Sequence, residues 1–160
     1  MDDIVIRELE PGDGKVLADY FRLLSEETRG FFPGYPFTDE ESLRIAKEES
    51  GHSDFKRYLA ISGTDGDGGG KPRAVGTVWF WSWNRAIPWL GISIADDYQG
   101  RGLGKRMMKH AIAQARESDK GGILLTTHRD NFRGRALYAR CGFEEIGHDD
   151  RGEILMLLSY

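Results

Sequence analysis

The chain has 160 residues, 39% of them hydrophobic and 30% charged, which suits one domain with a real core. Its formal net charge of −4 gives no global electrostatic support for a nucleic-acid partner. The single cysteine, Cys141, excludes an internal disulfide, and we expect it to be a packed thiol. No segment reaches the roughly 20 apolar residues that a membrane span needs, and no signal peptide is visible, so we expect a cytoplasmic protein without a membrane partner.

The first half of the chain predicts two helices and three strands. Residues 4–9 alternate as an edge strand, and residues 14–28 carry the apolar face of a helix. Thr38-Asp39-Glu40-Glu41 is a capping box that starts a second helix, which runs to about residue 50. Strands 56–62 and 73–83 should pair as a hairpin across the glycine-rich loop 63–70. That loop lacks the glutamate that ends an EF-hand, which favours a plain connection over a calcium site.

Aromatic residues gather in two places in this half. Residues 31–37 form a loop broken by prolines, between the two predicted helices. Trp79, Trp81 and Trp83 alternate along one strand and should share a face, with Phe80 on the other. Such a stripe suits either a cleft that receives a cation or packing against a helix, and the sequence leaves both open.

Gln99-Gly100-Arg101-Gly102-Leu103-Gly104 is the most informative stretch of the chain. It connects an apolar strand at residues 88–95 to an amphipathic helix at residues 102–118. Glycine permits close backbone approach, and the first N–H groups of a helix have no internal partner. The arrangement therefore predicts a phosphate site. The spacing fits neither a P-loop nor a dinucleotide fingerprint.

The remaining elements complete an α/β sandwich. A strand at residues 123–127 leads to Asn131, which can cap a helix over residues 132–141, and Gly142 ends that helix. Strands 143–147 and 153–158 close as a hairpin. We expect one mixed, mostly antiparallel sheet of about seven strands, flanked by about four helices. The four histidines show no ligand spacing, so we expect no metal.

These motifs resemble those of the GNAT superfamily of acetyl-CoA-dependent N-acetyltransferases. The resemblance rests on Gln99-x-x-Gly102-x-Gly104 and on Asn131 followed by Leu137-Tyr138 and Gly142-Phe143, in the family's order. Motif-level similarity covers residues 73–147, and the element order fits the chain as a single domain over residues 1–160. The resemblance implies acetyl-CoA as co-substrate and a primary amine as acceptor. Gly134 stands where many members have alanine.

The resemblance also implies roles for particular residues. The backbone of the strand would pair with the pantetheine arm, one N–H would polarise the thioester, and the glycine loop would hold the pyrophosphate. Lys105, Arg106 and Lys109 lie on the first turns of the helix and can add positive charge. Tyr138 is expected to be the general acid. The expected cofactor-binding residues are Ile92, Ser93, Ile94, Gln99, Gly100, Arg101, Gly102, Leu103, Gly104, Lys105 and Asn131.

The general base stays open at this point. In the ribosomal-protein alanine acetyltransferase branch a glutamate lies five residues before the conserved asparagine, whereas this chain has Thr126 there. The signature strand offers no ionisable group either. Four carboxylates lie near enough in the expected fold to act through water: Glu26, Glu27, Asp96 and Asp97. Bulk water itself is a further candidate for the base.

The sequence gives only partial information about the amine acceptor. Tyr35, Phe32 and Trp81 are the expected substrate-binding residues, since the aromatic loop and stripe should line the acceptor cleft. An acidic protein with an aromatic cleft suits a small cationic amine or a peptide amine. A homodimer is left open. The alternative function is a GNAT-fold acyl-CoA-binding sensor without efficient transfer, which the missing glutamate keeps in consideration.

Overall fold

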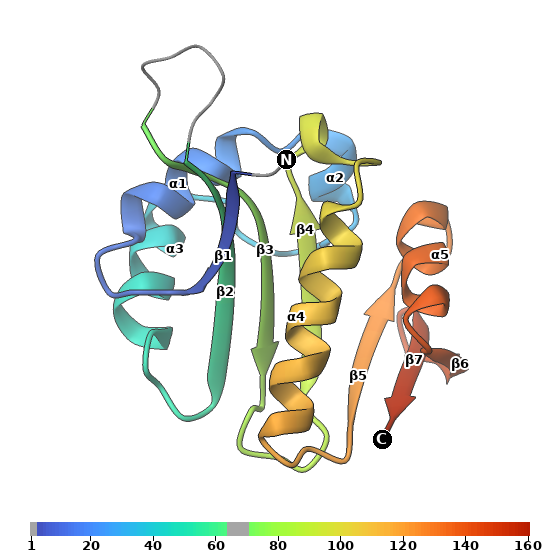
Figure 1. Cartoon of the computed structure of the whole chain (residues 1–160). Coiled ribbons are helices and arrows are strands. Elements are labelled where there is room, and N and C mark those ends of the chain that lie inside the picture. The colour runs from blue at the N-terminus through green and yellow to red at the C-terminus, as the bar shows by residue number, and fades with distance from the viewer. Residues whose placement is uncertain (1–2, 64–70) are drawn as a thin grey trace.

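The computed structural model describes residues 3–63 and 71–160, so most of the loop expected at residues 63–70, including its Asp-Gly repeat, lies outside the described residues. A mixed sheet of seven strands runs through the molecule in the order β1-β2-β3-β4-β5-β7-β6 (Figure 1). Its strands are β1 (Ile4–Glu8), β2 (Phe55–Ser62), β3 (Arg73–Trp81), β4 (Trp89–Ile94), β5 (Gly122–Thr127), β6 (Glu144–His148) and β7 (Ile154–Ser159).

Helices cover both faces of the sheet. A Cβ on Gly76 of β3 would touch Met107 of α4, whereas Ser93 of the adjacent β4 bonds Tyr20 of α1 on the opposite face, at 2.7 Å. The expected α/β sandwich is thereby confirmed. The helices are α1 (Gly14–Arg22), α2 (Glu26–Gly30), α3 (Asp39–Arg44), α4 (Leu103–Glu117) and α5 (Phe132–Arg140), and α3 continues as a π-helical turn, Ile45–Glu49. None of the described helices is long and apolar enough to cross a membrane.

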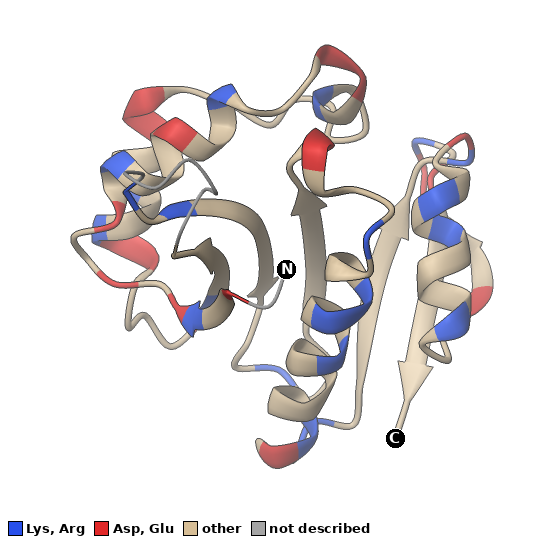
Figure 2. Cartoon of the chain, turned by 45° about the horizontal axis from the view of Figure 1, so that its top comes forward, with Lys and Arg blue, Asp and Glu red and all other residues tan. Residues whose placement is uncertain are grey.

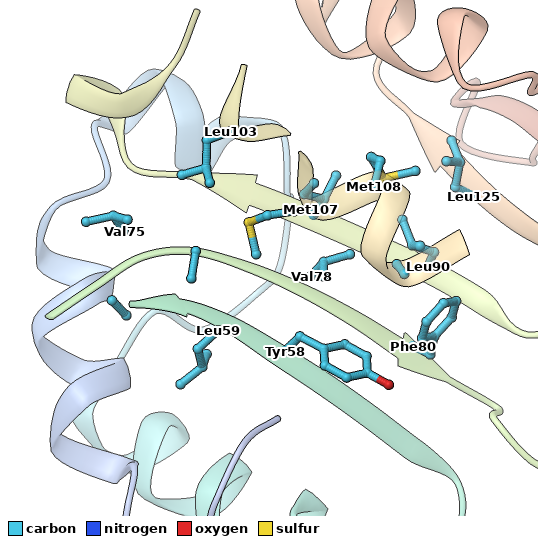
Figure 3. Packing of buried hydrophobic residues seen from close by; sticks show 14 of the residues in the cluster. Tyr58, Leu59, Val75, Val78, Phe80, Leu90, Leu103, Met107, Met108 and Leu125 are labelled. Atoms are coloured by element: carbon cyan, nitrogen blue, oxygen red, sulfur yellow. The ribbon is translucent and has the colours of Figure 1, made fainter. Parts of the chain in front are cut away.

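Part of the core lies between α4 and the sheet, and buried residues of α1, among them Leu17 and Phe21, also belong to the core. In Figure 3, Met107 of α4 lies over Val78 of β3 and Met108 lies beside Leu125 of β5, and Leu103 of the same helix is also part of this layer. All five side chains of this layer are almost completely removed from solvent. The stripe read from the sequence of this helix is therefore its buried face, and burial of that stripe fixes α4, with its glycine loop, against the sheet.

One predicted helix is two helices in the structure. The expected helix over residues 14–28 ends at Arg22, and α2 begins at Glu26. Ser25 caps α2 by accepting a bond from the Thr28 N–H at 3.1 Å, and the Ser25 N–H donates to the Asp96 carboxylate at 2.9 Å. A long-range carboxylate thus takes the donor that a continuous helix would have used. The predicted cap of α3 is confirmed, with the Glu41 N–H donating to Thr38 Oγ1 at 3.1 Å.

The tryptophan stripe is shorter than expected. Trp79 and Trp81 share one face of β3, but the strand ends at Trp81 and Ser82 has a φ of 53°. This left-handed residue interrupts the alternation of side chains. Trp83 consequently packs against Phe80, with ring centroids 4.7 Å apart, so its expected place in the stripe was wrong.

Strands β4 and β5 form the sheet's parallel pair, and they separate soon after they meet. Their pairing register consists of Trp89 opposite Leu124, and the Leu124 N–H donates to the Pro88 carbonyl at 2.9 Å. Beyond that point the two strands diverge toward their carboxyl ends, as Figure 1 shows. The edge of β4 from Ile92 to Ile94 therefore faces a gap rather than a neighbouring strand, and the described residues contribute no ladder partner for it on that side.

Gly91 makes room for Trp79 on the adjacent strand, because a Cβ there would lie 2.5 Å from Trp79 Cε2. We therefore expect Gly91→Ala to lower the free energy of unfolding by about 1–3 kcal/mol, as overpacking usually does. Gly12→Ala is the matched control, since a Cβ at Gly12 meets nothing within 4 Å, and it should change stability by less than about 0.5 kcal/mol. Urea denaturation of the three proteins measures both, and equal midpoints for the two variants would show that Trp79 is not held as described.

Candidate active site

The glycine loop presents unpaired N–H groups at the start of α4. Gly100 and Gly102 have φ values of 77° and 87°, a left-handed conformation that favours glycine. The first backbone bond of the helix runs from the Arg106 N–H to the Gly102 carbonyl, at 3.1 Å. Among the described residues, no group accepts from the N–H of Leu103, Gly104 or Lys105. This end of a 15-residue helix is suited to an anion.

Gln99 braces the loop from three sides. Its amide nitrogen donates to the Ile94 carbonyl at 3.0 Å and to Thr28 Oγ1 at 3.3 Å, and its amide oxygen accepts from Arg133 at 3.1 Å. The side chain thereby connects the end of β4, helix α2 and helix α5. A loop held in this way is set before a ligand arrives, which reduces the entropy lost on binding.

A cavity of about 700 Å³ opens between this loop, the free edge of β4 and the start of α5. Lys105, Arg133 and Arg140 are its cations, and Figure 2 shows Lys and Arg along α4 and α5. Phe31 and Phe32 from the aromatic loop form part of its wall. Nine of the expected cofactor-binding residues line it: Ile92, Ser93, Ile94, Gln99, Gly100, Gly102, Gly104, Lys105 and Asn131.

Two of the expected cofactor-binding residues have side chains that do not line this cavity, and neither do two of the three expected cations. The Arg101 guanidinium sits 5.2 Å from the centre of the Tyr98 ring, and the Leu103 side chain is in the core. Arg106 donates to the Ile4 carbonyl of β1 at 2.6 Å, so its charge stabilises the edge of the sheet instead. Of the three cations expected on the first turns of α4, Lys105 alone lines the cavity.

Asn131 caps α5, as its sequence position indicated. Its side-chain oxygen accepts from the Gly134 N–H at 3.1 Å, and its amide nitrogen lies 3.4 Å from Thr127 Oγ1. A Cβ on Gly134 would lie 2.5 Å from Asn131 Nδ2. The glycine at position 134 therefore permits this orientation of the asparagine, which explains the departure noted from the sequence.

Tyr138 also lines the cavity, from the middle of α5. Its ring is buried and packs edge-on against Phe143 at 6.2 Å. Burial raises the pKa of the Tyr138 hydroxyl above its ordinary value, so the group is protonated at neutral pH. In the described part of the chain no atom accepts from this hydroxyl. Burial also raises the pKa of the Cys141 thiol, which keeps the thiol protonated and fits a packing role.

A second cavity, of about 390 Å³, adjoins the first and shares Phe31 and Phe32 with it. Its floor is a row of residues across the sheet: Arg57 pairs with Trp79, Trp79 pairs with Gly91, and Thr126 follows on β5 beyond the gap. The three residues expected to bind the acceptor all line this cavity: Phe32, Tyr35 and Trp81.

The aromatic loop is half-buried rather than solvated. The Tyr35 and Phe37 rings lie 4.9 Å apart, and both pack against Phe21 of α1. Phe32 and Tyr35 also approach Trp79, with centroids 5.8 and 6.2 Å away. The loop therefore serves both as a lid over the core and as one wall of the second cavity.

Two buried charged residues of the second cavity were not predicted from the sequence. Arg57 is 4% exposed and Glu153 is 8% exposed, and both line the cavity. No ion-pair partner for either lies within the described ranges. Alternation places Arg57 on the same face of β2 as Leu59, and Glu153 precedes the last strand by one residue, but neither position indicates which other residues line the cavity. Only the pairing of distant strands reveals that they face one space.

The carboxylates considered from the sequence are less suitable as bases. Burial alone would raise the pKa of Asp96, but bonds from Ser25 and Thr28 hold that pKa below its ordinary value. Asp96 is therefore committed to capping α2. Glu27 lines the first cavity but is exposed, and Glu26 and Asp97 are exposed as well.

Comparison with known proteins identifies the family. The protein-family model described as "Acetyltransferase (GNAT) family" matches residues 17–143. Streptothricin acetyltransferase of Streptomyces lavendulae is 31% identical over 101 residues, 63% of this chain and 51% of that protein, so the chain spans about half its length. The 5-NmdU N-acetyltransferase of Pseudomonas phage PaMx11 is 27% identical over 141 residues, 76% of this chain and 91% of that protein.

Solved structures agree on the fold. The ribosomal-protein-S5-alanine acetyltransferase of Vibrio fischeri superposes with a TM-score of 0.83 at 18% identity, covering 100% of this chain and 93% of that one. The strand–glycine–helix loop, the gap beside β4 and the family model are in agreement, and the chain belongs to the GNAT acetyltransferase family.

Proposed function

We propose that this protein, as one domain over residues 1–160, is an N-acetyltransferase that moves an acetyl group from acetyl-CoA to a primary amine of a small molecule or peptide. One observation supports this most: two adjoining cavities meet beside the free edge of β4. The first has unpaired N–H groups and cations suited to a pyrophosphate, and the second has aromatic walls. A thioester at their junction would be within reach of an amine.

The reaction is a direct attack. The amine nitrogen attacks the thioester carbonyl carbon, the new C–N bond forms and the C–S bond breaks. Main-chain N–H groups of β4 from Ile92 to Ile94 are placed to polarise the carbonyl oxygen. Tyr138 gives its proton to the leaving sulfur and is reprotonated from solvent. Its raised pKa means that the hydroxyl carries its proton at neutral pH, which is the form that a general acid needs.

Glu153 is the proposed acceptor of the proton that the amine loses. It is a nearly buried carboxylate on the second cavity, with no ion-pair partner in the part of the chain that the structure describes. Thr126, the position where the sequence lacked the expected glutamate, pairs with Leu155, two residues after Glu153, and Thr126 and Glu153 line the same cavity. A base contributed by a different strand accounts for that absence.

The alternative, an acyl-CoA-binding sensor, needs the first cavity but not the second. The second cavity, with its aromatic walls and its buried Glu153, is the observation that favours the enzyme. Thiol release that depends on an added amine separates the two functions, since a sensor would bind acetyl-CoA without that release.

The glycine loop gives the first prediction for function. In Gly102→Glu a carboxylate would enter the anion site, so calorimetry should show acetyl-CoA binding lost or weakened by at least about tenfold. Gly102→Ala is the matched control. It places a non-glycine residue in the same left-handed conformation, and its Cβ would meet nothing within 4 Å, but it adds no charge. The alanine variant should bind much more tightly than the glutamate variant. Equal affinities for these two folded variants would place the pyrophosphate elsewhere.

Tyr138→Phe should lower turnover and leave acetyl-CoA affinity nearly unchanged, since only the hydroxyl is removed. General acid catalysis contributes about 10²–10⁴-fold, and a thiolate is a good leaving group, so we expect a loss near the lower end. Stability should change little, because the hydroxyl has no described hydrogen bond to lose. Single-turnover kinetics measure the chemical step, with Tyr58→Phe as the control for a buried hydroxyl remote from the cavities. A chemical step of wild-type rate in Tyr138→Phe would make the residue a packing aromatic.

Glu153→Gln should slow transfer to strongly basic amines more than transfer to weakly basic ones. A weakly basic amine is already neutral at neutral pH and needs less help with its proton, while general base catalysis contributes about 10²–10⁴-fold where help is needed. Thiol release from a series of amines of graded basicity measures the effect. Glu144→Gln, on the exposed side of β6, serves as the control. A loss that is uniform across the series would assign Glu153 to structure or binding instead of proton transfer.

A further inference from the structure

We propose that the amine acceptor carries an anionic group, a carboxylate or a phosphate, and that Arg57 binds this group on the floor of the second cavity. The inference rests on the proposed function, because it specifies the chemical class of the acceptor at the same site. It narrows the expectation drawn from the sequence, where a net acidic chain with an aromatic cleft suggested a simple cationic amine.

The guanidinium of Arg57 is held by neutral groups alone. Nη1 donates to Thr77 Oγ1 at 3.2 Å, and Nη2 donates to the Tyr35 hydroxyl at 3.4 Å. The plane lies over the Trp79 ring, with Cζ 4.6 Å from the ring centre. Nε is buried, and no described residue accepts a hydrogen bond from it. These contacts fix the orientation of the fork without neutralising its charge.

The charge of Arg57 stands out against the other cations of the cavity. A buried arginine is normally paired with an anion, because removing a charge from water is costly. Arg44 is bound by Glu41 and by Glu49, the latter at 2.8 Å. Arg151 is exposed and lies 3.6 Å from Asp149. In residues 3–63 and 71–160 no carboxylate lies within ion-pair distance of Arg57, so an anion on a ligand would supply the missing partner.

Arg57 and Glu153 lie toward opposite ends of the second cavity, which indicates how an acceptor would be oriented in it. Arg57 is on β2, and Glu153 precedes β7, which lies four strand spacings from β2. Three of these spacings are about 4.8 Å and the one between β4 and β5 is wider, so the two backbones are at least about 19 Å apart, whereas β4, beside which the thioester would lie, is only about 10 Å from β2. The cavity thus has an anion-binding end on β2 and a carboxylate at the end nearest the gap beside β4. A ligand with an amine at one end and an anion at the other matches both, whereas a polyamine would place a second cation against Arg57.

A binding experiment tests the inference without any turnover. Titrations followed by NMR would compare 4-methylbenzoate, 4-methylphenylphosphonate and the neutral 4-methylbenzamide on the wild-type protein. Charge-assisted bonds to an oriented guanidinium should make at least one anion bind about 10- to 100-fold more tightly than the amide. The two anions distinguish a carboxylate from a phosphate. Equal binding of all three ligands would overturn the proposal.

Variants then locate the effect. Arg57→Gln should bring the anions and the amide to parity, and Arg57→Lys, which keeps the charge but loses the fork, should retain part of the difference. Arg73→Gln, an exposed arginine at the start of β3, removes the same charge outside the cavity and should leave the preference unchanged. If Arg57→Gln does not fold, the lysine variant decides the question. An unchanged preference for anions in the folded variants of Arg57 would overturn the assignment.

Turnover separates this inference from the proposed function. With acetyl-CoA, 4-(aminomethyl)benzoate or its phosphonate analogue should have a kcat/KM at least tenfold above that of 4-(aminomethyl)benzamide, and the advantage should disappear in Arg57→Gln. Transfer to the amide and the anions at equal rates would overturn the inference while the acetyltransferase function stands. Thiol release that none of the added amines increases would refute the function, and the binding titration would still decide whether Arg57 binds an anion.

Discussion

The separation of β4 from β5 is the constraint on which the rest of the site depends. The two strands meet at Trp89 and Leu124, and the main chain of β4 then continues without a partner on that side. An unpaired strand edge inside a protein is a set of hydrogen-bonding groups that needs a ligand. The cavity beside the glycine loop and the aromatic cavity share Phe31 and Phe32, and both are lined by β4. The divergence therefore leaves both cavities beside one stretch of this strand.

The structure keeps this gap open by bonds between elements that are distant in the sequence. Gln99 connects β4, α2 and α5, and Asp96 caps α2. The buried stripe of α4 presses the helix onto β3 and β5, which fixes the unpaired N–H groups at its start. The hydrogen bond between Tyr20 and Ser93 attaches α1 to the same stretch of β4. Each of these contacts helps to fix the edge of β4 beside the gap, where the described residues leave main-chain hydrogen-bonding groups without a strand partner.

The sequence predicted the parts of this arrangement that depend on local chemistry. The glycine loop, the cap at Asn131 and the stripe of α4 follow from residue types at fixed spacing, and all three are found in the structure. The errors arose where a distant group decides the outcome. Asp96 divides the first predicted helix, and Ser82 turns Trp83 to the other face. Arg57 and Glu153 were missed because their shared cavity exists only through strand pairing across the whole sheet.

The central claim is that the two cavities hold acetyl donor and amine at once, for direct transfer. A single-turnover experiment with labelled acetyl-CoA tests it, with mass spectrometry of the protein before and after an amine is added. Direct transfer predicts no acetylated protein beforehand and, after the amine is added, free CoA and N-acetylated amine in equal amounts. An acetyl group on the protein before the amine arrives, or CoA release without acetylated amine, would contradict the account.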